Sequence, residues 1–483
     1  MVNNIEQQST LSVSLNKNLN RLKEELHITT DLKIRSLTIY DDIERDAAII
    51  YIDGITNTQN IQENILSPLL HIHKIESIET LIYRNLSIID VSSVTSFDEI
   101  LTGLSKGKTL VLIDGFKEGI LADSSDWQKR SVTEPDTQRA VKGPLNGFTE
   151  NLKVNINMIR NISQTHKLSV ENVQVGKETK TDVAILYLEG YVDEKVLEEA
   201  RQRIKEIDVT YLLESRVIED ALEGKKTLFP LAFTCERPGV VVSSLYEGRV
   251  AILINGNPYS IIVPTLFLHY FHQPDEYYTK SGRYANRLVR FLSWFLSIML
   301  LGLYVTMVRF HHNWVPHKFA DPFFKKSDTV FPILLEIFFV ALLFQLLVEA
   351  SLRIPKSTVI IVSLIGAIVV GQTAVTAKLI HPITLIIVGV NFLASIAIAA
   401  GGLYGTAMTT RTVFLFLGYF FGLTGLIVGT VIMIVYMASL KSLGVPYLAP
   451  FIPFRPKEMK DALFRGDLKK LINSKHTYPH KNK

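Results

Sequence analysis

Four apolar blocks, each 18 residues or longer and almost free of charge, follow one another between residues 288 and 438. A helix needs about 20 residues to cross roughly 30 Å of hydrocarbon, because each residue adds about 1.5 Å. Buried helices of soluble proteins are rarely so long. The pattern therefore predicts a transmembrane helical domain at 276–440. The blocks are residues 291–308, 358–377, 379–400 and 413–438.

A fifth block, residues 331–348, carries Glu336 and Gln345. If all five blocks crossed with the amino terminus inside, the basic tail would end outside, against the positive-inside rule. Six crossings would satisfy the rule, but the apolar stretch 260–271 is too short to supply another. We therefore expect four crossings plus one partial segment, with both termini in the cytoplasm.

Charge divides the chain into two unlike parts. Residues 281–483 hold 21 Lys and Arg against 7 Asp and Glu, so they carry about +14 while residues 1–280 carry about −10. Basic residues beside membrane helices and in the tail at 441–483 suit contact with anionic lipid head groups. The acidic part is typical of an ordinary soluble domain, and we expect no nucleic-acid partner.

Motifs for catalysis, metals and cofactors are missing. The single cysteine, Cys235, excludes an intrachain disulfide and a cysteine-cluster metal site. The segment GLSKGKT at 103–109 has the wrong glycine spacing for a phosphate-binding loop and precedes a strand instead of following one. The opening MVNNIEQQST lacks a basic-then-apolar pattern, so we expect no cleavable signal peptide. We expect no enzyme, no catalytic residue, no metal and no cofactor.

One phrase recurs four times in the acidic part, as AAIIYIDGI, KTLVLIDGF, DVAILYLEGY and RVAILINGNP. Each joins an apolar, β-branched run, which suits a buried strand, to Asp, Glu or Asn and then Gly, which suits a tight turn. The phrases lie 61 residues apart in the first pair and 66 in the second. Helical patterns between them would supply crossover helices. We predict two similar α/β units, at 28–125 and 151–275.

The sequence also predicts the structure of the segments that flank these units. In residues 1–27, Leu15, Leu19, Leu22 and Leu26 form an apolar stripe on an amphipathic helix that should pack on the first unit. Residues 126–150, rich in charge, Pro and Gly, read as a linker. A helix at 149–160 follows, which Thr149 or Asn151 can cap.

Polar side chains inside membrane helices normally face the protein interior or water. In the membrane domain these are Gln372, Thr373, Asn391 and, if its segment crosses, Glu336. The small-residue run around Gln372 lets helices approach closely, and a narrow apolar ring beside it could close a pore by dewetting. A helix buried among others is the alternative interpretation. The pore or gate candidates are Val369, Val370, Gln372, Thr373 and Glu336.

The last apolar block carries glycines at i, i+4, i+7 and i+11, a spacing that places them on one face of a helix. That face should pack against another helix, in this subunit or in a neighbour. The glycines are Gly418, Gly422, Gly425 and Gly429.

Several long motifs resemble the A subunit of bacterial spore-germination nutrient receptors of the GerA type. They are RSVTEPDTQRAVKGPLNGFTENLKVN, CERPGVV, YEGRVAILINGNPYSIIVPTLF, PDEYY, GQTAVTAKLIHP and GVPYLAPFIPFRP, in that order along the chain. The resemblance implies a two-part cytoplasmic α/β domain joined to a membrane bundle in the spore inner membrane. It also implies a transporter-like B subunit and a lipoprotein C subunit as partners, and a homo-oligomeric ring that forms a nutrient-gated ion channel.

One segment departs from the family pattern. The resemblance leads us to expect charged residues at three positions that hold Ala341, Gln345 and Val348. The sequence therefore gives less support to a charged pore wall at 331–349. A membrane-anchored sensor or scaffold, whose soluble domain binds a ligand while another subunit moves ions, is the alternative function. Motif residues between the two units read as an interdomain joint or subunit contact. They are Arg130, Glu134, Pro135, Gly143, Pro144, Gly147 and Phe148.

Overall fold

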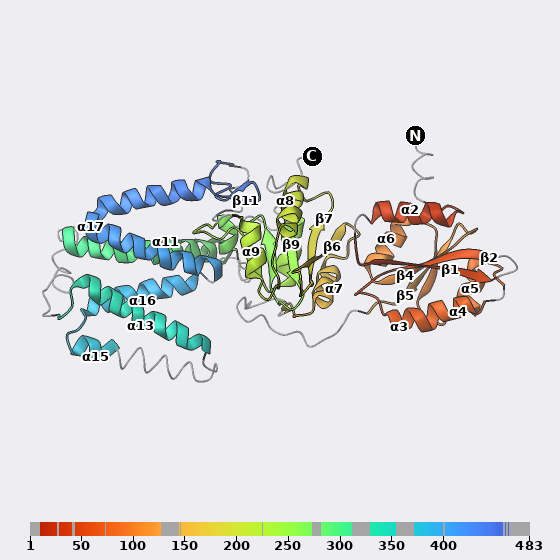
Figure 1. Cartoon of the computed structure of the whole chain (residues 1–483), viewed down its shortest axis with the longest axis horizontal. Coiled ribbons are helices and arrows are strands. Elements are labelled where there is room, and N and C mark those ends of the chain that lie inside the picture. Colours follow the sequence, from red (N-terminus) through yellow and green to blue (C-terminus); the bar gives the residue numbers. More distant parts are fainter. Residues whose placement is uncertain are drawn as a thin grey trace.

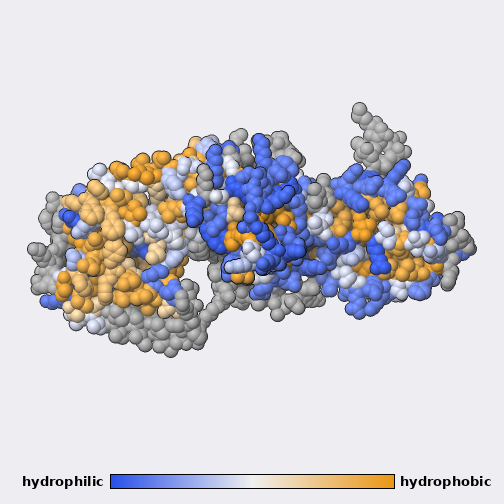
Figure 2. Space-filling model, viewed as in Figure 1, coloured by the Kyte–Doolittle hydropathy of each residue, from blue (hydrophilic) through white to orange (hydrophobic). Residues whose placement is uncertain are grey.

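The computed structural model of the chain has three parts in a row, two α/β units and a helical bundle (Figure 1). On the face shown in Figure 2, apolar residues cover most of the bundle, polar residues predominate on the second unit, and the first unit shows both kinds. The structure describes residues 10–26, 29–40, 44–72, 74–126, 144, 146–224, 226–272, 282–311, 329–353, 371–398, 401–456, 459 and 462.

The first unit is a five-stranded sheet covered by helices on both faces. Along each strand, successive side chains point to opposite faces, so alternate residues enter two separate cores. Ala48 and Ile50 pack toward α2 and α6, and Ile49 packs toward the α3–α5 side. The strands are β1 (Leu32–Tyr40), β2 (Glu44–Ile52), β3 (Val91–Val94), β4 (Lys108–Ile113) and β5 (Gly119–Asp123), in the order β1-β2-β4-β5-β3. The helices are α2 (Leu15–Glu25), α3 (Thr58–Ile61), the π-helix η1 (Gln62–Leu66), α4 (Ser67–Leu70), α5 (Ile78–Arg84) and α6 (Phe97–Ser105).

The second unit repeats this arrangement, with strand order β6-β7-β9-β10-β8. Helices α7 and α10 cover one face and α8 and α9 the other. The two similar α/β units predicted from the recurring phrase are therefore present. The strands are β6 (Leu168–Val175), β7 (Thr181–Leu188), β8 (Phe233–Cys235), β9 (Val250–Ile254) and β10 (Ser260–Val263). The helices are α7 (Leu152–Ser163), α8 (Glu194–Lys205), α9 (Arg216–Glu223) and α10 (Pro238–Tyr246).

Each recurring phrase forms a buried strand, β2, β4, β7 or β9, followed by a glycine with φ between 79° and 93°. The expectation of crossover helices is wrong, because β2 pairs with β4, and β7 with β9, in antiparallel register. A crossover joins parallel neighbours, whereas here the helices lie in long connections between antiparallel strands.

The two units meet through α7, which Asn151 caps by accepting from the N–H groups of Lys153 and Val154. Arg160 on α7 donates to both carboxylate oxygens of Asp31 in the first unit, at 2.6 and 2.9 Å. Both side chains are less than a tenth exposed. The N–H of Thr30 also donates to the carbonyl of Val170 on β6 at 2.9 Å. A buried, two-pronged ion pair therefore holds the units together.

Within the part of the bundle that the structure describes, three helices are long and apolar enough to cross a membrane, at Ala285–Phe310, Ile333–Ala350 and Gly402–Ser439. The segment at 331–348, expected to cross only partly, belongs to one continuous helix, and the block at 379–400 holds a shorter helix than a crossing needs. The block at 358–377 lies mostly outside the described residues. The bundle helices are α11 (Gly282–Phe310), α13 (Ile333–Arg353), α15 (Gly371–Thr376), α16 (Pro382–Ala397) and α17 (Gly401–Ser439).

Helix α17 is bent into a hairpin at Gly422, where φ is 62° and ψ is −144° (Figure 1). A β-carbon built on Gly429 would lie 3.6 Å from Cζ of Phe414. In a straight helix, these two positions would be about 22 Å apart. The prediction of a single crossing at 413–438 is therefore wrong, because a positive φ turns the chain back within an unbroken apolar run.

After the hairpin the chain returns to the second unit and forms a short two-stranded ribbon, β11 (Lys441–Ser442) and β12 (Val445–Pro446). The Ser442 hydroxyl donates to the carbonyl of Leu231 at 2.6 Å and accepts from the N–H of Thr265 at 2.9 Å. The N–H of Phe267 donates to the carbonyl of Tyr447 at 2.9 Å. The segment after α17 therefore lies at the same end of the bundle as the α/β units.

Candidate functional site

A buried carboxylate joins three helices of the bundle. Glu336 on α13 is 3% exposed and accepts from the N–H of His381 at 3.1 Å and from the hydroxyl of Thr384 at 2.8 Å. The Thr384 hydroxyl also bonds to that of Tyr304 on α11 at 3.0 Å. Because these partners lie at the amino-terminal end of α16, the helix dipole also favours the negative charge. Glu336, a pore candidate, thus faces the interior of this subunit and stabilises the joint between α11, α13 and α16.

Arg411 lies halfway along the first segment of α17, a position that the sequence analysis missed. Its Nη1 donates to Oδ1 of Asn391 at 2.9 Å. Asn391 in turn donates to the carbonyls of Leu296 at 3.2 Å and Ser297 at 2.9 Å on α11. A charged group at this depth is costly and normally faces protein or water. The signal in the sequence is an arginine flanked on both sides by long uncharged runs, but the apolar block predicted to cross begins only at Val413.

The remaining pore candidates are two valines and two polar residues. Val369 and Val370 lie outside the described residues. Gln372 and Thr373 are exposed on α15, where the carbonyl of Gln372 accepts from the hydroxyl of Thr376 at 2.8 Å. Their side chains are therefore available to water, lipid head groups or another chain.

The four glycines of the predicted stripe do not share one helix face, because the hairpin separates them. A β-carbon at Gly418 would lie 2.5 Å from the carbonyl oxygen of Gly302 on α11, so these two helices touch backbone to backbone. Gly422 forms the turn. Gly425 and Gly429 face Leu417 on the opposite arm, at 2.5 and 2.6 Å from the nearest Leu417 atom by the same construction.

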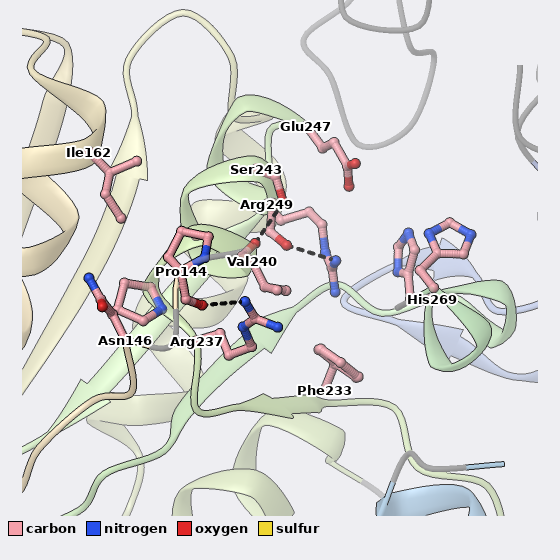
Figure 3. A pocket seen from close by; sticks show the side chains of 14 residues that line it. Pro144, Asn146, Ile162, Phe233, Arg237, Val240, Ser243, Glu247, Arg249 and His269 are labelled. Atoms are coloured by element: carbon pink, nitrogen blue, oxygen red, sulfur yellow. Dashed lines mark hydrogen bonds between the residues drawn. The ribbon is translucent and has the colours of Figure 1, made fainter. Parts of the chain in front are cut away.

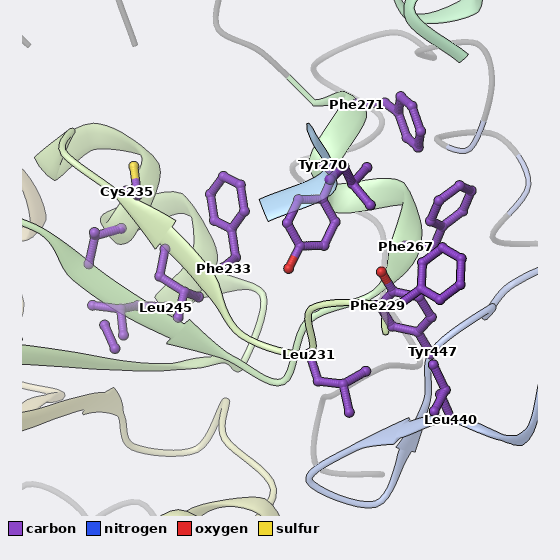
Figure 4. Packing of buried hydrophobic residues seen from close by; sticks show 14 of the residues in the cluster. Phe229, Leu231, Phe233, Cys235, Leu245, Phe267, Tyr270, Phe271, Leu440 and Tyr447 are labelled. Atoms are coloured by element: carbon purple, nitrogen blue, oxygen red, sulfur yellow. The ribbon is translucent and has the colours of Figure 1, made fainter. Parts of the chain in front are cut away.

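The second unit and the bundle share one buried core. The ring of Phe267, in the 3₁₀ turn η2 (Phe267–Phe271), lies 4.9 Å from that of Trp294 on α11 and 6.0 Å from that of Tyr447, measured between centroids. Figure 4 shows aromatic side chains from η2, the segment before β8 and the segment after α17 converging here. This cluster is continuous with the core of unit two, so η2 packs directly between that core and the bundle.

Tyr270, also in η2, packs against the beginning of α17. Its hydroxyl donates to the carbonyl of Ala232 at 2.8 Å, and its ring lies 3.4 Å from a β-carbon built on Gly402. Burial raises the pKa of Tyr270 well above its usual value, so the hydroxyl stays protonated and able to donate.

Comparison with known proteins identifies the chain. Residues 20–477 match the family described as Bacillus/Clostridium GerA spore germination protein. The chain belongs to the GerA family. Spore germination protein KA of Bacillus subtilis (strain 168) is 35% identical over 466 residues, which cover 95% of this chain and 86% of that protein. Spore germination protein GerLA of Bacillus cereus is 28% identical over 456 residues, 92% of each chain.

A solved structure also resembles this GerA-family chain. It is the crystal structure of the N-terminal domain of the A subunit of the Bacillus megaterium spore germinant receptor GerK3, 30% identical in sequence. The match covers 54% of this chain and 98% of that one, with a TM-score of 0.41.

The motif residues between the units of this GerA-family chain are partly described. Phe148 is buried in the core of unit two, and its N–H donates to the carbonyl of Glu236 at 2.8 Å. The carbonyl of Pro144 accepts from Arg237 at 2.8 Å. Two motifs far apart in the sequence therefore meet on the second unit. Gly147 lies between these contacts, and Arg130, Glu134, Pro135 and Gly143 lie outside the described residues.

Proposed function

We propose that this GerA-family chain is the A-type subunit of a nutrient receptor in the spore inner membrane, not an enzyme. It acts with a transporter-like B subunit and a lipoprotein C subunit, and several copies form a ring around an ion-conducting pore. Nutrient opens the pore, and ion release starts germination. Family membership supports the receptor role.

The proposal of a pore between copies rests on one observation. Polar side chains buried in the bundle form hydrogen bonds with neighbouring helices of the same chain. Glu336, Thr384 and Asn391 are buried and hydrogen-bonded to neighbouring helices within the chain. These three groups tie helices together within the subunit instead of facing an open path for ions. An ion-conducting path therefore forms more readily between copies of the chain than within one copy.

The mass of the detergent-solubilised chain tests this proposal. We expect a homo-oligomer, because a single bundle of this kind does not enclose a pore. If the chain purified alone is a monomer, and ion flux in liposomes appears only when the B subunit is added, then the alternative holds. In that case the chain is a membrane-anchored sensor or scaffold.

The segment containing Val369, Val370, Gln372 and Thr373 is the proposed pore lining. Val370→Ser should hydrate an apolar gate and cause germination without nutrient. A variant that accumulates normally and stays silent until nutrient is added, with Val369→Ser behaving alike, would remove this segment as the gate.

We propose further that the α/β units and the tail face the cytoplasm. The basic residues of 441–483 and the return of the chain to unit two after α17 support this orientation. In a Cys235→Ser background, a cysteine placed at Ser474 should not react with an impermeant maleimide added to intact cells. Labelling from outside would refute the orientation.

A further inference from the structure

A cavity of about 380 Å³ opens in unit two, on the side of α10 where the end of the interdomain linker lies (Figure 3). It is separate from the ion pair that joins the two units. Its walls are largely apolar and include Pro144, Ile162, Phe233 and Val240. Pockets of this size with apolar walls and a few directed polar groups are typical of sites for small organic molecules.

Two arginines flank α10 and reach into this cavity, Arg237 before the helix and Arg249 after it (Figure 3). Arg249 is 3% exposed and donates to the carbonyl of Pro264 at 2.9 Å, Oγ of Ser244 at 3.2 Å and Oγ1 of Thr265 at 3.1 Å. A guanidinium carries five N–H groups, so two remain for a ligand. Burial lowers the pKa of Arg249 to about 10, which leaves it cationic at neutral pH.

The charges around the cavity favour an anion. Among the described residues that line it, two arginines face one carboxylate, that of Glu247. A carboxylate matches the planar guanidinium with two parallel hydrogen bonds. The apolar walls would accommodate the rest of such a molecule.

We propose that this cavity binds a small organic carboxylate, held at Arg237 and Arg249 and packed against Phe233 and Val240. The site is distinct from any pore and does not depend on one. One wall is formed by His269 of η2, the turn whose Phe267 packs on α11, so an occupied cavity would stabilise one position of that turn.

Equilibrium dialysis of the full-length chain in detergent tests the site, with radiolabelled benzoate as the probe and neutral benzamide as its match in shape. We expect saturable binding of benzoate and none of benzamide. Arg237→Gln removes the charge but keeps a donor for the Pro144 carbonyl, and should weaken benzoate binding about tenfold or more.

Gly239 supplies a matched pair of variants that separates binding from folding. It lines the cavity, and a β-carbon built on it meets nothing within 4 Å. Gly239→Leu should fill the cavity and abolish benzoate binding, whereas Gly239→Ala should retain it, with both variants melting near the wild-type temperature.

Three results with benzoate and benzamide would overturn the proposal. They are no saturable benzoate binding to the wild-type chain, equal binding of benzamide, or undiminished benzoate binding to folded Gly239→Leu. If inorganic phosphate displaces benzoate while further small carboxylates do not, the site recognises phosphate, and the carboxylate assignment is wrong.

Discussion

Replacing Gly418 with alanine should destabilise the bundle, because its backbone touches that of α11. The new β-carbon would lie 2.5 Å from the carbonyl oxygen of Gly302 and 3.0 Å from its carbonyl carbon and Cα. These are backbone atoms, which cannot rotate away. Overpacking of this kind typically costs about 1 to 3 kcal/mol. Separating the helices would also lengthen the 3.1 Å bond from the Thr306 hydroxyl to the Gly418 carbonyl, worth about 1 kcal/mol.

Gly405→Ala is the matched control, since it lies in the same helical segment and a β-carbon there meets nothing within 4 Å. Replacing glycine with alanine inside a helix stabilises the helix by about 1 kcal/mol at either position, so this contribution cancels in the comparison. We expect Gly418→Ala to unfold in SDS titrations with a free energy about 2 to 4 kcal/mol below that of Gly405→Ala. Equal stabilities would refute the backbone contact. Loss of the oligomer with an unchanged subunit would instead assign Gly418 to a contact between copies.

Three further outcomes follow from the contacts of other side chains. Asp31→Ala should lower the free energy of unfolding by about 3 to 5 kcal/mol, because it leaves Arg160 buried without the carboxylate that pairs with it. Limited proteolysis should then separate the two units. An unchanged melting temperature and an unchanged cleavage pattern would contradict this. Glu336→Gln keeps an acceptor for the N–H of His381, so its melting temperature should be near that of the wild type, whereas that of Glu336→Leu should be clearly lower. Equal melting temperatures of the two variants would show that the acceptor is unimportant. Burial raises the pKa of Cys235 to about 12, so maleimide labelling of the folded chain should stay negligible and should not accelerate from pH 7 to 9. The denatured chain should label readily. Rapid labelling of the folded chain would show that the thiol is accessible.

Local patterns in the sequence determined much of the α/β part. An apolar run that ends in Asp-Gly, Glu-Gly or Asn-Gly dictates a buried strand and a turn at positive φ, since both depend on neighbouring residues alone. The leucine stripe predicted the buried face of α2, and of the two predicted caps, Thr149 and Asn151, it is Asn151 that caps α7. The direction of the strands could not be predicted, because the paired residues of β2 and β4 lie 60 to 66 positions apart and the pattern is the same in parallel or antiparallel register.

In the bundle, composition determined that the helices are apolar, and the tertiary structure alone decided their path. Hydrophobicity reports the surroundings of a residue and not the direction of the chain, so the two arms of α17 read as one helix. Only packing against Phe310 and Leu417 shows that Gly422 turns the chain and that Gly425 and Gly429 face the other arm. The cavity beside α10 likewise depends on Arg237 and Arg249 being brought together by the fold, which spacing along the chain does not encode.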